Sequence, residues 1–435
     1  MNLNLKQLLQ DKFVRGTAFL TAANFIASAL NYFVHPILTR HLSVPAYGDF
    51  QAFLSFTTIA AVISAVAMTT LTKKISQLAA GSPEKIEALR RRASFHLFFI
   101  GLALFALILI FSGPLNELLK ISEPGVLIIA SLNLLYIFPL VVNRAALTGV
   151  QDFPALSLST VLDAVSRLSL IIFLVVVLLQ GLNGAAYSLG LTGFLAFLIS
   201  FWQIKRLRLL PNNDGFKPSL RALWPYALLV LWFTALYQFF YNFDMLFVKS
   251  VFSPEEAGLY GSLLTIGRII YFIGASVPLV MFPVLAGLKD DNGSRRHAIL
   301  GKSLLLMSGL TIPAYLVIAL FPEFVIKIVV GAKYLSMAPY LPSFALVILL
   351  LTLLTVLSQY FLALAKRRGL VVLSIAALLE IILLMSFHDN IWEIIYSLTA
   401  VFGGASLALI ILFLSDFLAT RRARFILPTK GADIL

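Results

Sequence analysis

Residues 337–364 read MAPYLPSFALVILLLTLLTVLSQYFLAL and contain no charged side chain. A helix of about 20 apolar residues spans the hydrocarbon core of a bilayer, so this stretch is long enough to cross a membrane. Inside lipid every backbone N–H and C=O group has to be paired, which leaves helices or closed barrels. Barrel strands would alternate in hydrophobicity over about ten residues, and the length of this run therefore favours a helix.

Apolar stretches of this kind recur along the whole chain of 435 residues. The composition is 60% hydrophobic and 12% charged, whereas an ordinary soluble domain is about 25% charged. Such a chain cannot bury its apolar surface inside a water-facing globule. The sequence therefore predicts an all-α integral membrane protein, with no soluble domain large enough to carry out chemistry by itself.

We expect about twelve transmembrane helices, separated by turns that contain proline, glycine and asparagine. The predicted spans are residues 16–38, 44–70, 93–112, 124–147, 156–179, 184–204, 223–248, 256–285, 301–321, 337–364, 370–386 and 391–416. They form an N-lobe of six helices over residues 16–204 and a C-lobe of six over 223–416. The flanking segments are an amphipathic lead at 1–15, a cytoplasmic linker at 205–222 and a basic cytoplasmic tail at 417–435.

Lysine and arginine are distributed unequally between the two sides of these spans. Of the 33 basic residues, 26 fall on the side of the N-terminus, five on the other side and two inside spans. This bias predicts a multi-pass protein of the cell (plasma) membrane with both termini in the cytoplasm. It also explains the net charge of +13 without a nucleic-acid partner. Arg144 and Lys249 lie near span ends, where a long basic side chain can reach the interface.

The two halves of the chain share a short pattern. Residues 42–50 (LSVPAYGDF) precede the second span, and residues 252–260 (FSPEEAGLY) precede the eighth. Serine, glycine and an aromatic residue occur at the same offsets in both. Because six helices separate the copies, both have the same orientation in the membrane. The pattern predicts two parallel, pseudo-symmetric six-helix lobes related by an axis along the membrane normal.

Five ionisable residues lie inside predicted spans: Asp163, Arg167, Asp244, Arg268 and Glu380. A charge at the bilayer centre costs about 2.5–3.5 kcal/mol on insertion scales, so these side chains are expected to face a cavity or each other. Asp163 and Arg167 are four residues apart and can pair on one helix face. Both a neutralised structural pair and a functional site remain open for them.

Polar residues form one face of the first span. They are spaced by four or three positions and comprise Thr17, Thr21, Asn24, Ser28, Asn31 and His35. A polar face over five turns would be costly against lipid, and we favour a water-filled cavity over packing against a neighbouring helix. In the seventh span Tyr237 shares a face with Phe233, Phe240 and Asp244. These rings could stack on sugars, although packing or lipid contact explains them as well.

The sequence lacks the residues that several classes of function require. The chain has no cysteine, and its five histidines are scattered without metal-ligand spacing. Gly301-Lys302-Ser303 resembles the end of a P-loop, but Arg296 occupies the position of the upstream glycine. We therefore expect no catalytic or metal site and no ATP-driven transport by this chain alone. Secondary transport, a channel or a membrane-embedded transferase remain.

Two hairpins carry a family resemblance. Residues 37–42 (ILTRHL) with 47–50 (YGDF), and residues 244–248 (DMLFV) with 253–260 (SPEEAGLY), resemble signatures of bacterial polysaccharide and O-antigen flippases. These flippases belong to the multidrug/oligosaccharidyl-lipid/polysaccharide (MOP) exporter superfamily. The resemblance implies a V-shaped, two-lobed secondary transporter that works by alternating access. Its implied substrate is an undecaprenyl-pyrophosphate-linked oligosaccharide, carried from the inner to the outer leaflet.

A pyrophosphate needs cationic partners, and guanidinium groups bind phosphate oxygens in a fork geometry. The candidates for the substrate cavity are, in order, Arg268, Arg167, Arg144 and Arg40, together with the polar residues Asn24, Ser28, Asn31 and Tyr237. Related lipid II flippases hold sodium among helices 7, 11 and 12. That likeness implies Asp244 and Glu380 as ion-coupling residues, with Thr399 as a further ligand, and we add Asp163 as a candidate.

The chain departs from that pattern at Ala376, one turn before Glu380, which offers no side-chain oxygen. Sodium and proton coupling therefore both remain open, and no other cofactor is expected. The chain also lacks two C-terminal helices typical of lipid II flippases, which favours a polysaccharide precursor.

The expected partners are the lipid-linked oligosaccharide, membrane lipids, and a polysaccharide polymerase with other assembly proteins. Three rival functions remain: a cation-coupled multidrug exporter, a membrane-embedded glycosyltransferase or ligase, and a structural subunit of a synthase complex.

Overall fold

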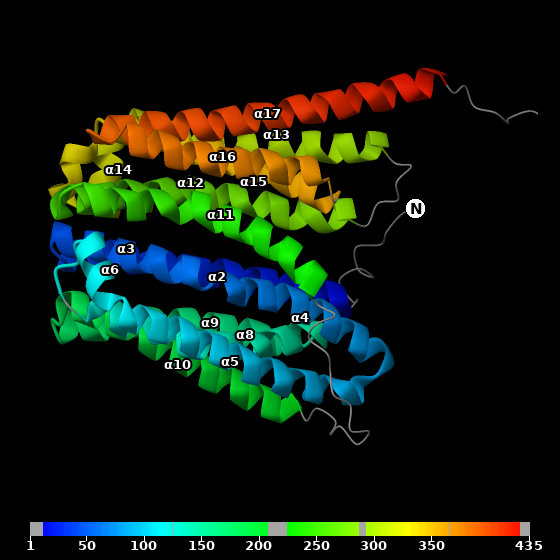
Figure 1. Cartoon of the computed structure of the whole chain (residues 1–435), viewed down its shortest axis with the longest axis horizontal. Coiled ribbons are helices and arrows are strands. Elements are labelled where there is room, and N and C mark those ends of the chain that lie inside the picture. The colour runs from blue at the N-terminus through cyan, green and yellow to red at the C-terminus, as the bar shows by residue number, and fades with distance from the viewer. Residues whose placement is uncertain (1–11, 124, 208–223, 287–292, 365, 427–435) are drawn as a thin grey trace, which may run out of the picture. The chain divides into compact units, whose positions relative to one another are not determined.

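The computed structural model describes residues 12–123, 125–207, 224–286, 293–364 and 366–426. Over these ranges the chain consists of helices joined by short turns, and no strand occurs in them (Figure 1). The predicted all-α class is confirmed. The helices lie in the order α2 Lys12–His41, α3 Val44–Ala60, α4 Val62–Gly81, α5 Ile86–Ile110, α6 Ser112–Leu118, α7 Val126–Ser131, α8 Asn133–Gly149, α9 Phe153–Ile171, α10 Gly181–Leu207, α11 Trp224–Val251, α12 Pro254–Ala286, α13 Gly293–Leu320, α14 Pro322–Val329, α15 Leu341–Ala363, α16 Arg367–Ser386 and α17 Ile391–Ile426.

Ten helical segments of the described chain are long and apolar enough to cross a membrane. They coincide with ten of the twelve predicted spans. The other two predicted spans, 16–38 and 223–248, are also long helices, with 30 residues in α2 and 28 in α11. Both contain asparagine and other polar side chains, which lower their mean hydropathy.

The predicted boundaries agree with the structure to within a few residues in most spans. The segment predicted at 44–70 differs, because it is interrupted at Ala61 and continues as α4 to Gly81. The end of the fifth span, Ile172–Val177, is a π-helical turn. Hydrophobic periodicity missed the short helices α6 and α14. The predicted lead and linker fall largely on residues 1–11 and 208–223, which lie outside the described ranges, as does the end of the predicted tail at 427–435. Residues 417–426 of that tail continue helix α17.

The chain forms two compact units, Met1–Gly261 and Ser262–Leu435. The first unit holds α2 to α11 and the beginning of α12, and the second holds the remainder. Within each unit the long helices run side by side (Figure 1). The predicted division into lobes at residues 205–222 stays a prediction.

In the first unit α8 packs against α4, α5 and α10, while α2 packs against α9, and α11 against α3 and α4. The α4–α5–α8 group has an apolar core that includes Ile75, Leu89 and Val142. In the second unit α15 contacts α13 and α17, and α16 contacts α17. Phe344, Leu354 and similar side chains of α15 are almost completely buried there. Much of the remaining surface is apolar, as expected where lipid is the solvent.

Candidate functional site

The two repeated motifs each begin a helix. Ser43 caps α3 by accepting a hydrogen bond from the backbone N–H of Ala46, at 3.3 Å. Ser253 caps α12, where its Oγ accepts from the N–H of Glu256 at 3.2 Å and the Glu256 carboxylate accepts from the N–H of Ser253 at 3.0 Å. This reciprocal capping box satisfies two backbone donors that a helix start leaves without partners. The serine shared by the motifs therefore fixes where both helices begin.

The two motifs also contact each other at equivalent positions. A Cβ atom on Gly48 would lie 2.8 Å from the backbone nitrogen of Gly258, which is 210 positions later. A Cβ atom on Gly258 would clash with the carbonyl oxygen of Val44. Gln51 donates from Nε2 to the carbonyl oxygen of Gly261, at 3.3 Å and again 210 positions away. Contacts between equivalent residues are what two copies related by a two-fold axis give, and they support the predicted repeat.

A buried ion pair lies beside this contact. Lys249 Nζ of α11 is 2.5 Å from Asp49 Oδ1 of α3, and both side chains are 0% exposed. The second oxygen, Asp49 Oδ2, accepts from the backbone N–H of Ser122 at 3.0 Å and from its hydroxyl at 2.5 Å. The expectation that Lys249 reaches out to the interface is wrong. Its carboxylate partner lies 200 positions away in the sequence, and no local pattern reveals it.

Lys120 hydrogen-bonds to the backbone at the same end of α11. Its Nζ donates to the carbonyl oxygens of Val251 and Phe252, each at 2.9 Å. These carbonyls belong to the last turn of α11, where backbone acceptors have no partner within the helix. The backbone of Lys120 has a φ of 46°, a conformation that non-glycine residues rarely adopt. The turn after α6 is therefore shaped so that Lys120 and Ser122 both reach the α3–α11 contact.

Two tyrosines link these helices to others. Tyr47, which is fully buried, has its hydroxyl 2.8 Å from Gln51 Nε2 and 3.1 Å from His35 Nδ1 of α2. Tyr260 donates to Oδ2 of the buried Asp244 at 2.7 Å. Asp244, a predicted ion-coupling residue, is thus held by a hydroxyl from the second motif. Tyr237, about two turns earlier on α11, is half-buried.

Two candidate arginines of the first unit lie on α8 and α9: Arg144 near the end of its predicted span and Arg167 inside its span. Arg144 donates from Nη2 to Asp163 Oδ2 at 3.0 Å and contacts Oγ and the carbonyl oxygen of Ser159, each at 3.2 Å. The pairing of Asp163 with Arg167, which their spacing allows, is not found, since Asp163 pairs with Arg144 of α8 instead. The Nε of Arg167 has no hydrogen-bond partner within the described residues. Arg40, at the end of α2, is exposed and donates to the carbonyl oxygen of Pro36 at 2.9 Å.

Helix α2 has three distinct faces, because successive residues are rotated by about 100°. One face is buried and comprises Ala23, Ala27, Val34 and Leu38. The adjacent face carries the predicted polar stripe, in which Asn24 and Ser28 are exposed while Asn31 and His35 are half-buried. The third face is exposed and apolar, and Phe25 is 77% exposed there. Among the described helices of the first unit, none therefore packs against the middle of the stripe.

The second unit contains the remaining predicted residues. Arg268 of α12 is 6% exposed, and Glu380 of α16 is fully buried. The hydroxyl of Thr399 on α17 donates to the carbonyl oxygen of Ile395 at 2.7 Å, which leaves its lone pairs available to a ligand. Lys366, before α16, pairs with Asp416 of α17 at 2.6 Å.

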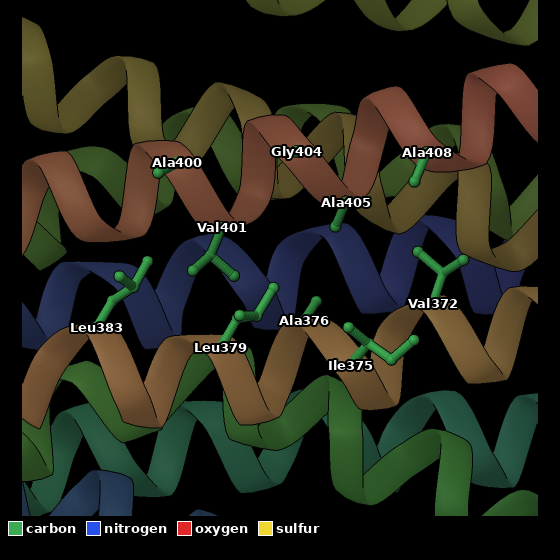
Figure 2. Close-up of a pocket in the computed structure, with 10 residues that line it drawn as sticks. All are labelled: Val372, Ile375, Ala376, Leu379, Leu383, Ala400, Val401, Gly404, Ala405 and Ala408. Atoms are coloured by element: carbon green, nitrogen blue, oxygen red, sulfur yellow. The ribbon is translucent and has the colours of Figure 1, made fainter.

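A pocket of about 210 Å³ lies between α16 and α17 (Figure 2). Its lining is entirely apolar and consists of Val372, Ile375, Ala376, Leu379, Leu383, Ala400, Val401, Gly404, Ala405 and Ala408. Ala376 is the position at which the chain departs from the sodium-site pattern. The side chains that Figure 2 labels provide no oxygen or nitrogen for an ion or a phosphate, so this pocket suits only hydrocarbon.

Comparisons with known proteins agree with this architecture. An inward-facing multidrug resistance MATE family transporter of the MOP superfamily superposes with a TM-score of 0.72 at 16% identity, covering 90% of this chain and 94% of that one. The lipid II flippase MurJ, in an inward closed conformation, gives a TM-score of 0.68 at 15% identity, covering 95% and 93%.

A MOP superfamily transporter from Pyrococcus furiosus gives a TM-score of 0.64 at 17% identity and covers 95% and 97%. Its description states that the reverse polarity of its binding pocket suggests a different function. No curated protein matches the chain by sequence.

These likenesses, all below 20% identity, establish the fold of the MOP transporters. The sequence itself matches the model of a family described as polysaccharide biosynthesis protein over residues 37–339, which includes both hairpin motifs. That match covers more than half of the chain. The chain belongs to this polysaccharide biosynthesis family, and it is a multi-pass membrane protein with the fold of the MOP superfamily transporters.

Proposed function

We propose that the chain flips an oligosaccharide linked to undecaprenyl pyrophosphate from the inner to the outer leaflet of the cell membrane by alternating access. The observation that carries the proposal is the exposed polar face of α2 next to the arginine-bearing helix α9. Asn24 and Ser28 would be costly against lipid tails, so they require water or a polar substrate at mid-membrane depth. A glycan whose lipid tail stays in the bilayer meets that requirement.

The α8–α9 arginines suit the pyrophosphate. Asp163 pairs with Arg144 and not with Arg167, so helices α8 and α9 carry two arginines and one carboxylate, a net positive charge. Ser159 and Asp163 orient the Arg144 guanidinium, which can then present its remaining N–H groups to phosphate oxygens. Arg268 and Arg40 are the further candidates for the same substrate group. Asn24, Ser28, Asn31 and Tyr237 would contact the sugars.

Transport of this kind needs an energy source, and we propose an ion gradient. Glu380 is the strongest candidate for the coupling residue, because a bare charge on a fully buried carboxylate is costly and binding a proton or a sodium ion removes that cost. Asp244, Thr399 and Asp163 are the other candidates. Sodium and protons both remain possible coupling ions.

A cation-coupled multidrug exporter is the second candidate, because MATE transporters share the fold. The same fold can host different functions, and the charge of the cavity decides between them. A drug cation would favour an acidic cavity, whereas Arg144 and Arg167 favour an anionic substrate. No catalytic step is part of the proposal, and a glycosyltransferase or ligase is the least favoured reading. Both termini are expected in the cytoplasm. A polysaccharide polymerase and other assembly proteins are the proposed protein partners.

The proposal is tested by expressing the chain in a bacterial strain that lacks its own O-antigen flippase. We expect surface polysaccharide to be restored, and Arg268→Ala to abolish it while the protein still inserts in the membrane. Lys327→Ala is the control, because Lys327 is an exposed residue paired only within α14. Drug resistance without restored polysaccharide, in cells with confirmed expression, would favour the exporter. Normal polysaccharide with Arg268→Ala would remove that residue from the site.

A further inference from the structure

Four segments of the first unit meet at one end of its helices. They are the start of α3, the turn after α6, the end of α11 and the start of α12. The distribution of basic residues places this end on the outer side of the membrane. An outer gate would have to open at such a junction, if the chain works by alternating access as proposed above.

The junction is dry and closely packed. Asp49 and Lys249 are both 0% exposed, and the glycine contact between α3 and α12 leaves no room for a side chain. Asp49 is held by partners from segments other than its own helix: Lys249 lies on α11, and Ser122 lies on the turn after α6. Separating α3 from α11 would therefore break the ion pair and hydrate both charges.

A buried ion pair differs from an apolar contact in how reversible it is. Its Coulomb attraction is largely offset by the cost of removing two charges from water, and that cost is recovered when the charges are hydrated again. Apolar side chains of similar volume hold such an interface at least as tightly, while a single buried charge without its partner opposes closure strongly. The pair thus keeps the closed junction stable but able to open.

We propose that the Asp49–Lys249 ion pair is a reversible lock on the outer gate of this transporter. Ser122 and Lys120 are the positioning residues of the lock, because they fix the carboxylate and the end of α11. The inference rests on the proposed transport by alternating access and adds to it the residues that set the balance between the two states.

The chain has no cysteine, so a single Ser28→Cys substitution provides a reporter on the polar face of α2. Its rate of reaction with a membrane-impermeant maleimide is measured in intact cells and in inside-out vesicles. Three variants are made in this background: Asp49→Asn, the apolar pair Asp49→Leu with Lys249→Met, and the exchanged pair Asp49→Lys with Lys249→Asp. The control is Lys327→Ala, which breaks an exposed i,i+4 pair.

We expect Asp49→Asn to raise labelling from outside by about tenfold, the change that about 1.4 kcal/mol would cause. The apolar pair should lower outside labelling and raise labelling from inside, because it holds the gate closed. The exchanged pair keeps both charges, so its rate of labelling from outside should be closer to the parent rate than that of Asp49→Asn. This variant tests the lock even where Asp49→Asn fails to fold. The control should match the parent.

Equal labelling in all variants, or a shift in the same direction for Asp49→Asn and the apolar pair, would overturn the lock while leaving the transport proposal standing. If Ser28→Cys without further substitution reacts from neither side, the polar face of α2 does not line a water-filled cavity. That result would also overturn the proposed lock. Restored polysaccharide in the complementation test separates these two failures.

Discussion

Gly48 lies against Gly258, its equivalent 210 positions later, so closely that a Cβ atom on Gly48 would be 2.8 Å from the backbone nitrogen of Gly258. The contact joins the first turns of α3 and α12, both of which begin with a capping serine. Each glycine therefore meets backbone atoms, which cannot move aside as a flexible side chain can. Both copies of the sequence motif therefore need glycine at this position, because the two helices pack too closely there for a side chain.

We predict that Gly48→Ala lowers stability by about 1–3 kcal/mol, the usual cost of overpacking. Gly309→Ala is the matched control, because Gly309 also lies in a helix but has no atom within 4 Å of its Cβ position. Alanine in an open helical position is favoured over glycine by about 1 kcal/mol, so the control should be neutral or stabilising. Thermal unfolding of the purified variants in detergent measures both. Equal midpoints would show that α3 and α12 can separate slightly without cost.

Arg144 and Asp163 provide a second prediction, because their ion pair can be purely structural or part of the substrate site. We expect Arg144→Ala to reduce surface polysaccharide at least about tenfold, since a lost contact to a charged group costs about 1.5–3 kcal/mol. The double variant with Asp163→Ala removes the carboxylate that Arg144→Ala leaves buried. A substrate-binding Arg144 predicts that the double variant stays inactive, and recovery of activity would assign the pair to structure alone. Protein level in the membrane is measured in parallel.

The helices could be predicted from the sequence because their signal is local. A run such as residues 341–363 carries its own evidence of length and hydropathy, and a proline marks its start. The break at Ala61 has no such mark, because alanine is a strong helix former, and the prediction ran through it. Short helices such as α14 fall below the length at which periodicity is informative.

The site could be predicted only in part, because only some of its signals are local to one helix. The polar stripe of α2 is periodic within one helix, and its exposed middle agrees with the expected cavity face. The partners of Asp163 and Lys249 lie on other helices, so spacing along one helix could not identify them. For Asp163 the nearest arginine in sequence, Arg167, was the wrong choice.

Glu380 leads to a prediction about energy coupling. Glu380→Gln keeps the shape of the side chain but removes its charge, and we expect transport to lose its dependence on the ion gradient. The measurement compares surface polysaccharide, or flipping in vesicles, with and without ionophores that collapse the proton or the sodium gradient. Thr399→Val is the comparison variant. It removes a hydroxyl whose lone pairs could bind sodium, and it leaves every titratable group of the chain in place. An ionophore response that is the same in parent and Glu380→Gln would place coupling elsewhere.

The α2 stripe gives the last prediction, which concerns water in the cavity. In the cysteine-free chain, cysteine at Asn24 or Ser28 should react with a water-soluble maleimide, because both side chains are exposed on a polar face. Cysteine at Ala27, which is 5% exposed, should react at least about tenfold more slowly, and cysteine at the lipid-exposed Phe25 should stay unreactive, because a thiol in hydrocarbon does not ionise readily. Reaction at Phe25 but not at Ser28 would reverse the assignment of the faces and place the stripe against lipid or a second protein. Faster reaction of cysteines at Ser28 and Asn24 than at Ala27 and Phe25 would establish that water reaches the middle of the membrane along α2. A path that carries a glycan requires such water.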